Sequence, residues 1–260
     1  MIRLLLADVL PLEDPAAYAT LYREASPERR RVADSFRFVK DRNLSIGAAA
    51  LLDRGLGAFG LRERDMKYGR STKGKPFFLN APEIHFSISH SGTKVAVALG
   101  DEEIGCDIEQ AVAEQLSAQS AEHEAAKCLE LAGRFFRHEE YLVIKAAGSP
   151  VDRIRMFYRC WTLKESYMKA TGLGIALPPD SFSVAALCTG LSGFVGHALS
   201  RAAAPDLSDT AGSEPMNTFL STSCQDFVFY TPECFEWYMC ALCCRPDAGE
   251  PALEYVGLDV

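Results

Sequence analysis

The chain has 260 residues, of which 48% are apolar and 24% charged, and this balance excludes a disordered or fibrous protein. Its length suffices for one large domain or for two smaller ones, each with its own core. No stretch reaches the ~18 consecutive apolar residues that a membrane-spanning helix needs, and the apolar run at the start is too short for a signal peptide. Nine Cys at irregular spacing favour reduced thiols, so we expect a cytosolic protein that does not associate with membranes.

Charge is divided unevenly along the chain. Residues 1–100 carry 16 Lys and Arg against 11 Asp and Glu, a net charge of +5, whereas residues 101–260 carry 11 against 24, a net charge of −13. The total of −8 argues against a nucleic-acid-binding protein. The basic first part is suited to a phosphorylated ligand or to an acidic partner, although a solvated basic face would give the same pattern.

The first part of the chain predicts a strand over residues 2–9, followed by helices. One helix begins at Ser26-Pro27-Glu28, with Ser26 as N-cap and Pro27 in the first helical position. The next runs from about Asp41 to Arg54 and ends at Gly55.

A basic loop is expected over residues 62–83. Apolar and polar residues then alternate with a period of two in three stretches, which predicts a three-stranded antiparallel meander over residues 84–89, 94–99 and 104–109.

The remainder of the chain returns to helices and then to strands. Helices are predicted over 111–146 and 152–171, a surface loop over 204–217, and strands near 181–187, 193–199, 226–230 and 235–243. Helices and antiparallel strands thus occur in both parts, which predicts an α+β fold of two similar halves, residues 1–110 and 111–260.

Two carboxylates stand out in the third strand of the predicted meander. Asp107 and Glu109 lie at i and i+2, so both side chains leave the same strand face about 6–7 Å apart. Such a pair can bind one hard cation, although a polar outer strand face would have the same sequence.

A second group of charged residues lies on the predicted helix 152–171. Trp161, Glu165 and Lys169 recur at i, i+4 and i+8 and therefore form one stripe of the helix. A Glu–Lys pair at this spacing is commonly a surface ion pair. Beside Trp161 and a further lysine, Lys164, it also fits a site that holds phosphates around a metal ion.

Four motifs occur in one order along the chain: Gly74-Lys75-Pro76, then FSISHSG over residues 86–92, GCDIE over 105–109 and WTLKESYMKATG over 161–172. In their order, spacing and content they resemble the 4′-phosphopantetheinyl transferase family, in its larger, surfactin-synthetase-activating type. The resemblance extends over roughly residues 20–182 and is looser in the C-terminal strands.

The resemblance implies a cytosolic, monomeric enzyme of two similar α+β halves, a pseudo-dimer with coenzyme A bound in the cleft between them. Such an enzyme moves the phosphopantetheine arm of coenzyme A onto a Ser hydroxyl of an acidic acyl or peptidyl carrier protein. Adenosine 3′,5′-bisphosphate (3′,5′-ADP) is released, and Mg²⁺ is the cofactor.

The resemblance also assigns roles to single residues. The Mg²⁺ ligands would be Asp107, Glu109 and Glu165, and the catalytic residues Glu165, Asp107 and Lys169, with Glu165 as the base for the incoming hydroxyl. Residues that bind coenzyme A would be Lys164 and Lys169 at the pyrophosphate, Lys75 and His90 at the 3′-phosphate with Pro76 and Ser89 beside them, and Arg29 and Arg42 as further phosphate ligands.

The same residues leave two alternatives open. A metal-dependent phosphohydrolase could use the same carboxylates, and a non-catalytic module could bind coenzyme A without turnover. The three carboxylates disfavour the second of these.

Overall fold

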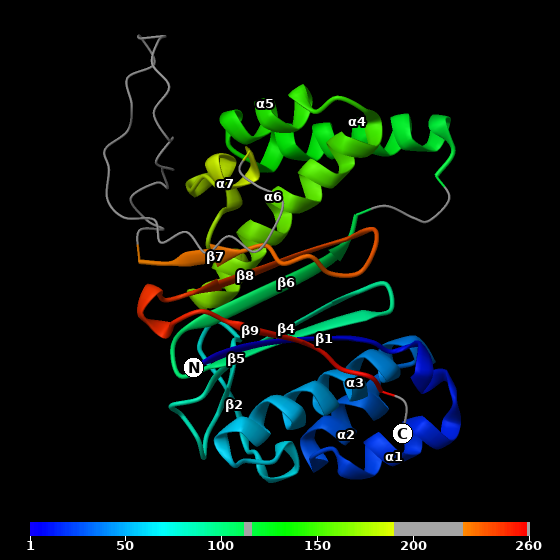
Figure 1. The fold of residues 1–260 in the computed structure, drawn as a ribbon, viewed down its shortest axis with the longest axis vertical. Helices are drawn as coiled ribbons and strands as arrows, with labels where there is room; N and C mark the ends of the chain where they lie inside the picture. Colours follow the sequence, from blue (N-terminus) through cyan, green and yellow to red (C-terminus); the bar gives the residue numbers. More distant parts are fainter. Residues whose placement is uncertain (112–115, 190–225, 259–260) are drawn as a thin grey trace.

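A computed structural model describes residues 1–111, 116–189 and 226–258 (Figure 1). The helices are α1 (Pro15–Glu24), α2 (Pro27–Ser35), α3 (Val39–Leu56), α4 (Ala118–Phe135), α5 (His138–Ala146), α6 (Pro150–Ala170) and α7 (Ala185–Thr189). The strands are β1 (Ile2–Asp8), β2 (Tyr68–Arg70), β3 (Pro76–Phe78), β4 (His85–Ser91), β5 (Lys94–Gly100), β6 (Ile104–Gln110), β7 (Val228–Tyr230), β8 (Tyr238–Cys244) and β9 (Ala252–Tyr255).

The strands form two main sheets. The first has the order β4-β5-β1-β9, in which β9 is parallel to β1 and the other pairs are antiparallel. The second is antiparallel and has the order β6-β8-β7, and β2 and β3 form a short separate hairpin.

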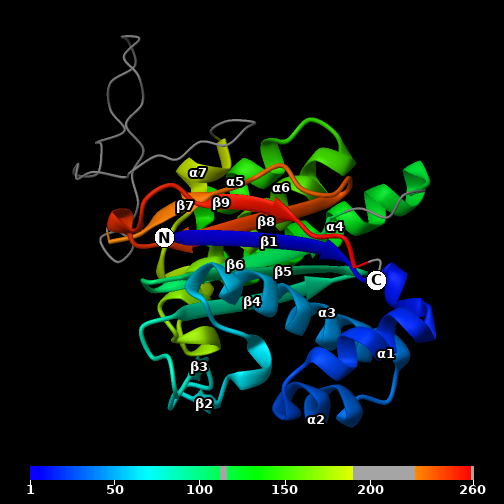
Figure 2. The same cartoon turned by 60° about the horizontal axis from the view of Figure 1, so that its bottom comes forward.

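Helices and sheets lie in four layers, with helices outside and the two sheets between them (Figures 1 and 2). One apolar cluster joins α1–α3 to the first sheet, and another joins α4–α6 to the second. A third cluster fills the space between the sheets with side chains such as Leu4, Ala98 and Leu242. Each sheet is therefore covered on both faces, and the α+β class predicted from the sequence is confirmed.

Local signals predicted several elements correctly. The hydroxyl of Ser26 accepts a hydrogen bond from the backbone N–H of Arg29, so Ser26 is the N-cap of α2 as expected. The hairpin of β4 and β5 is present, and strands β7 and β8 lie where two C-terminal strands were expected.

Other predictions were wrong. Strand β6 pairs with β8 rather than with β5, so the three-stranded meander is not formed, because an alternating pattern predicts a strand but not its neighbour. Helix α3 continues through Gly55, which lets the helix pack directly on Leu99.

Short elements account for the remaining differences. The expected loop 62–83 contains β2 and β3, and the expected strand near 181–187 is instead a turn followed by α7. The expected helix 111–146 is two helices, α4 and α5, and β9 was not predicted. The predicted strand 193–199 and loop 204–217 lie outside the described residues.

The two sheets do not follow a division at residue 110. Strand β6 precedes that boundary but belongs to the sheet of β7 and β8, and β9 near the C-terminal end pairs with β1. In the described part of the chain, no helix is both long and apolar enough to cross a membrane.

Candidate active site

The seam between β4 and β6 is held by serine side chains of β4. Ser87 accepts a hydrogen bond at Oγ from the backbone N–H of Cys106, at 3.0 Å. At the next two positions on the same face of β4, Ser89 Oγ donates to Asp107 Oδ1 at 2.6 Å, and Ser91 Oγ donates to Glu109 Oε2 at 2.8 Å. These bonds fix the register between strands of different sheets and orient both carboxylates.

Asp107 faces helix α6 and is paired there with Lys169. Lys169 Nζ lies 2.6 Å from Asp107 Oδ1 and 3.1 Å from Ser89 Oγ. Burial raises the pKa of Asp107, although the lysine and the Ser89 hydroxyl oppose this. Burial is the largest single influence on Lys169 and favours its neutral form, but the charge and hydrogen bond of Asp107, together with neighbours such as Glu165, outweigh it and raise the pKa of the ammonium. Asp107 is therefore a buried partner of a cation, and it does not lie on a polar outer strand face, the alternative that the sequence left open.

A cavity of about 350 Å³ lies over this pair and contains the other two predicted carboxylates, Glu109 and Glu165. Burial raises the pKa of both, and the charge of Asp107 raises each further. The cavity is also lined by Ile88, Ser89, His90, Trp161 and Lys169. The predicted stripe of Trp161, Glu165 and Lys169 on α6 thus faces the carboxylates of β6.

The carboxylates suit a hard cation, but they are not assembled around one. Asp107 Oδ2 is buried and has no hydrogen-bond partner, so one carboxylate oxygen is available as a ligand. Within residues 1–111, 116–189 and 226–258, no three His, Cys, Asp or Glu side chains are close enough to hold a metal ion. The Lys169 ammonium instead neutralises Asp107. The carboxylate oxygens are nevertheless of the type that Mg²⁺ binds, and Asp107, Glu109 and Glu165 are the residues that would hold it.

A larger cavity of about 740 Å³ adjoins the first at Ile88 and His90. Three arginines, Arg29, Arg31 and Arg70, line this basic cavity, together with the carboxylates of Glu28 and Asp41. Partial burial and the nearby Lys169 lower the pKa of His90, which stands between the two cavities. The arginines of the basic cavity outnumber its carboxylates, and this balance suits a phosphorylated ligand.

A third cavity of about 270 Å³ is lined by Lys75 and Pro76. It adjoins the carboxylate cavity, because Ile88 and Lys169 line both. Lys75 Nζ donates to the carbonyls of Ile104 and Ala170, at 3.1 and 3.0 Å, and burial lowers its pKa. Lys75 therefore also ties the loop before β3 to the end of α6.

Lys164, which the resemblance assigned to the pyrophosphate, does not line any of these three cavities. Its side chain is fully buried in an ion pair with Glu140, at 2.7 Å, and it donates to the carbonyls of Pro179 and Phe182. On a helix, adjacent residues point about 100° apart, so Lys164 cannot share the face of Glu165. Burial lowers the pKa of Lys164.

Arg42 is also not among the described side chains that line the basic cavity, although its neighbour Asp41 is. Its Nε donates to the carbonyl of Phe36, which holds the side chain at the start of α3. Arg31 and Arg70 line the cavity instead. Both belong to basic stretches of the sequence, but nothing in their local spacing distinguished them from solvated charges.

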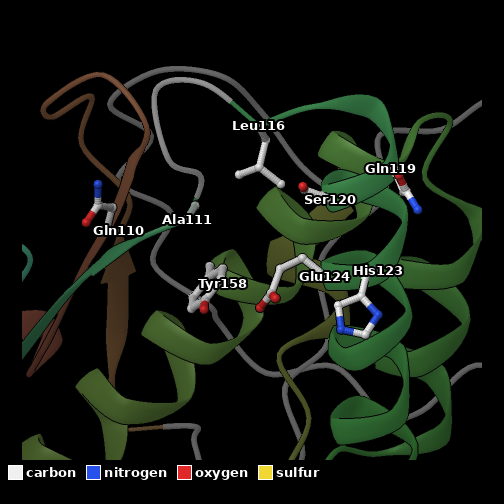
Figure 3. Close-up of a pocket in the computed structure, with 8 residues that line it drawn as sticks. All are labelled: Gln110, Ala111, Leu116, Gln119, Ser120, His123, Glu124 and Tyr158. Carbon is white, nitrogen blue, oxygen red and sulfur yellow. The ribbon is translucent and has the colours of Figure 1, made fainter.

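Two further cavities lie along α6. Figure 3 shows one of about 590 Å³ between the end of β6, α4 and α6, and none of the predicted site residues lines it. The other, about 300 Å³, is apolar and is lined by Leu131, Phe135, Phe136, Phe157, Tyr158, Trp161 and Pro179. Trp161 borders both this apolar cavity and the carboxylate cavity.

Together, the layered α+β fold and these cavities define a protein that places acidic side chains and a lysine beside a basic cavity of about 740 Å³. The sequence pattern of the 4′-phosphopantetheinyl transferase superfamily matches residues 103–201. This region of the chain therefore resembles that superfamily.

Proteins with similar sequences are named as phosphopantetheinyl transferases. The chain is 33% identical over 160 residues to the 4′-phosphopantetheinyl transferase Sfp of Bacillus subtilis strain 168, and 32% identical over 160 residues to a 4′-phosphopantetheinyl transferase of Bacillus subtilis. In both cases the match covers 61% of this chain and 65% of the relative. An L-aminoadipate-semialdehyde dehydrogenase-phosphopantetheinyl transferase of Rattus norvegicus is 28% identical over 172 residues, or 63% of this chain and 53% of that protein. These matches confirm the resemblance found in the four motifs.

Proposed function

We propose that the chain transfers the 4′-phosphopantetheine arm of coenzyme A to a serine hydroxyl of an apo carrier protein and releases 3′,5′-ADP. The observation that carries this proposal is the Asp107–Lys169 pair, which lies under Glu109 and Glu165 where three cavities meet. The match to the superfamily and the names of the relatives support the same reaction.

Coenzyme A would bind with its nucleotide in the basic cavity and its pyrophosphate over Lys169. Arg29 and His90 line the basic cavity, and Lys75, Pro76 and Ser89 line the cavities next to it. Phosphate oxygens accept charge-assisted hydrogen bonds from such groups. The pantetheine arm would then leave on the side of Trp161, where the lining becomes apolar.

In the transfer, the serine oxygen bonds to the phosphorus that carries the arm, and the bond from that phosphorus to the 3′,5′-ADP oxygen breaks. Glu165 takes the hydroxyl proton, and its raised pKa brings it nearer to the working pH of a general base. Lys169 holds the charge of the pyrophosphate as the bond breaks. A bound Mg²⁺ would supply charge neutralisation on the same oxygens.

We further propose that the protein is a cytosolic monomer of two similar halves with coenzyme A in the cleft between them. The carrier protein would be acidic, since the first 100 residues carry a net charge of +5. If so, the affinity for the carrier should fall as salt rises from ~50 to ~300 mM.

Intact-mass measurement of apo carrier proteins tests the proposal, after incubation with coenzyme A, Mg²⁺ and this protein. The expected result is a gain of one phosphopantetheine arm by the carrier. A phosphohydrolase would instead consume coenzyme A without any carrier, and a binding module would leave both unchanged. Either result contradicts the transferase proposal.

A further inference from the structure

The carboxylate of Glu63 is buried next to Arg29 and Tyr68, two residues that line the basic cavity. Glu63 lies in a short turn before β2, and its side chain is 1% exposed. Its Oε2 accepts from the backbone N–H of Ser26 at 2.6 Å, and its Oε1 accepts from the Ser26 hydroxyl at 2.7 Å and from the Tyr68 hydroxyl. The N–H of Glu63 donates to Asp53 at 2.9 Å, which fixes the turn itself.

Through these bonds Glu63 controls two residues of the cavity wall. Because the Tyr68 hydroxyl gives its hydrogen to Glu63, its oxygen faces Arg29, whose Nε lies 3.4 Å away. The Arg29 guanidinium also lies over the Tyr68 ring, 4.9 Å from its centre, and its Nε is 4.0 Å from Glu63 Oε1. Because Ser26 caps α2, Glu63 also fixes the helix from which Arg29 projects.

This arrangement leaves the outer edge of the guanidinium for a ligand. Arg29 Nε faces the protein, whereas Nη1 and Nη2 make no hydrogen bond to any residue in the described part of the chain. The side chain is 14% exposed and lines the basic cavity with Arg31, Arg70 and His90. A planar fork held in this way suits a phosphate group.

We propose that Glu63 is a positioning residue that sets the preference of the site for a ligand with a phosphate on the 3′ position of the adenosine, acting through Arg29 and Tyr68. The proposal rests on the function proposed above, in which Lys169 holds the pyrophosphate and the basic cavity holds the nucleotide. Glu63 would thereby let the protein distinguish coenzyme A from its form without the 3′-phosphate.

Only a carboxylate can accept all three hydrogen bonds at once, because an amide has one acceptor oxygen. Glu63→Gln therefore reorients the Tyr68 hydroxyl and loosens Arg29. If Glu63 acted through its charge alone, removing a negative charge near an anion site would strengthen phosphate binding. The two explanations predict opposite results.

The test is titration calorimetry of the full chain with 3′,5′-ADP and with 5′-AMP, which differ in the 3′-phosphate. We expect Glu63→Gln to lower the affinity for 3′,5′-ADP by about tenfold and to change that for 5′-AMP by less than about twofold. Arg29→Ala should cause a similar loss, and Glu63→Gln should add nothing in the Arg29→Ala background.

Two further variants serve as a second probe and a control. Tyr68→Phe removes only the hydroxyl between Glu63 and Arg29, so it should weaken binding of 3′,5′-ADP by about threefold even if Glu63→Gln fails to fold. Glu83→Gln removes an exposed carboxylate on the same half and should bind both nucleotides like the unaltered protein.

Tighter 3′,5′-ADP binding by Glu63→Gln, an equal loss of both nucleotides, or additive effects with Arg29→Ala would overturn the inference and leave the transferase proposal standing. If the unaltered protein bound neither nucleotide, the proposed function itself would fail.

Discussion

Strand β6 and helix α6 are in close backbone contact at Gly105, and Gly105→Ala should separate them. A Cβ at this position would lie 2.0 Å from the carbonyl oxygen of Ser166 and 2.4 Å from the backbone N of Ala170. Real Cβ atoms essentially never lie within 3.0 Å of such atoms, so the two backbones must move apart by about 1 Å. Neither obstacle is a flexible side chain that could rotate away.

The expected cost is at the upper end of that for overpacking, about 3 kcal/mol of unfolding free energy. For a chain of this size that corresponds to about 6–12 °C in Tm. The site should suffer as well, because Asp107 follows on the same strand and Lys169 on the same helix, and a shift of about 1 Å can cost about 10²-fold in rate.

Urea unfolding followed by tryptophan fluorescence measures the stability, and the carrier assay measures the rate. Gly57→Ala is the matched control, because Gly57 has a helical backbone and a Cβ there would meet nothing within 4 Å. That variant should be unchanged or more stable by about 0.4–1 kcal/mol. If Gly105→Ala were as stable as the unaltered protein, or if Gly57→Ala lost as much, the close approach of β6 and α6 would not limit stability.

Three further outcomes are expected. Lys164→Met leaves the buried charge of Glu140 unpaired, so the free energy of unfolding measured in urea should fall by about 3–5 kcal/mol. Adding Glu140→Gln to the same chain should restore part of this loss. A loss no larger than that of a surface variant would contradict the prediction. Glu165→Gln should lower turnover far more than coenzyme A affinity, whereas Lys169→Ala should reduce both, as measured by carrier-protein kinetics and calorimetry; near-normal values for both variants would reduce this stripe to a structural role. The pKa of His90 is lowered in the free protein, and a bound phosphate would raise it again, so binding takes up a proton. The affinity of the unaltered protein for 3′,5′-ADP, divided by that of His90→Gln, should therefore rise as pH falls from 7.5 towards the free-protein pKa below 6.5. A ratio independent of pH would show that no phosphate lies near His90.

Much of the local structure could be predicted from the sequence. The period of two in β6 determines that Asp107 and Glu109 share one face of the strand. The helical period of α6 determines that Trp161, Glu165 and Lys169 share one face of the helix. The N-cap of α2 is likewise a local signal. These features depend on residues within one or two turns of each other.

Contacts between distant segments were decided only by the tertiary structure. The pairing of β6 with β8 joins residues more than 120 positions apart, and no local pattern distinguishes β8 from β5 as the partner. The ion pair of Lys169 with Asp107 and the burial of Lys164 against Glu140 depend on how α6 packs between β6 and α5.

The two lysines of α6 show the physical reason. Lys164 and Lys169 have the same charge and the same motif, but one is enclosed between helices and the other faces the cleft. Glu63 is similar, because its role comes from Ser26 and Tyr68, which are joined to it only by folding. A side chain's type determines which bonds it can make, whereas the packing of distant segments determines which of those partners it meets.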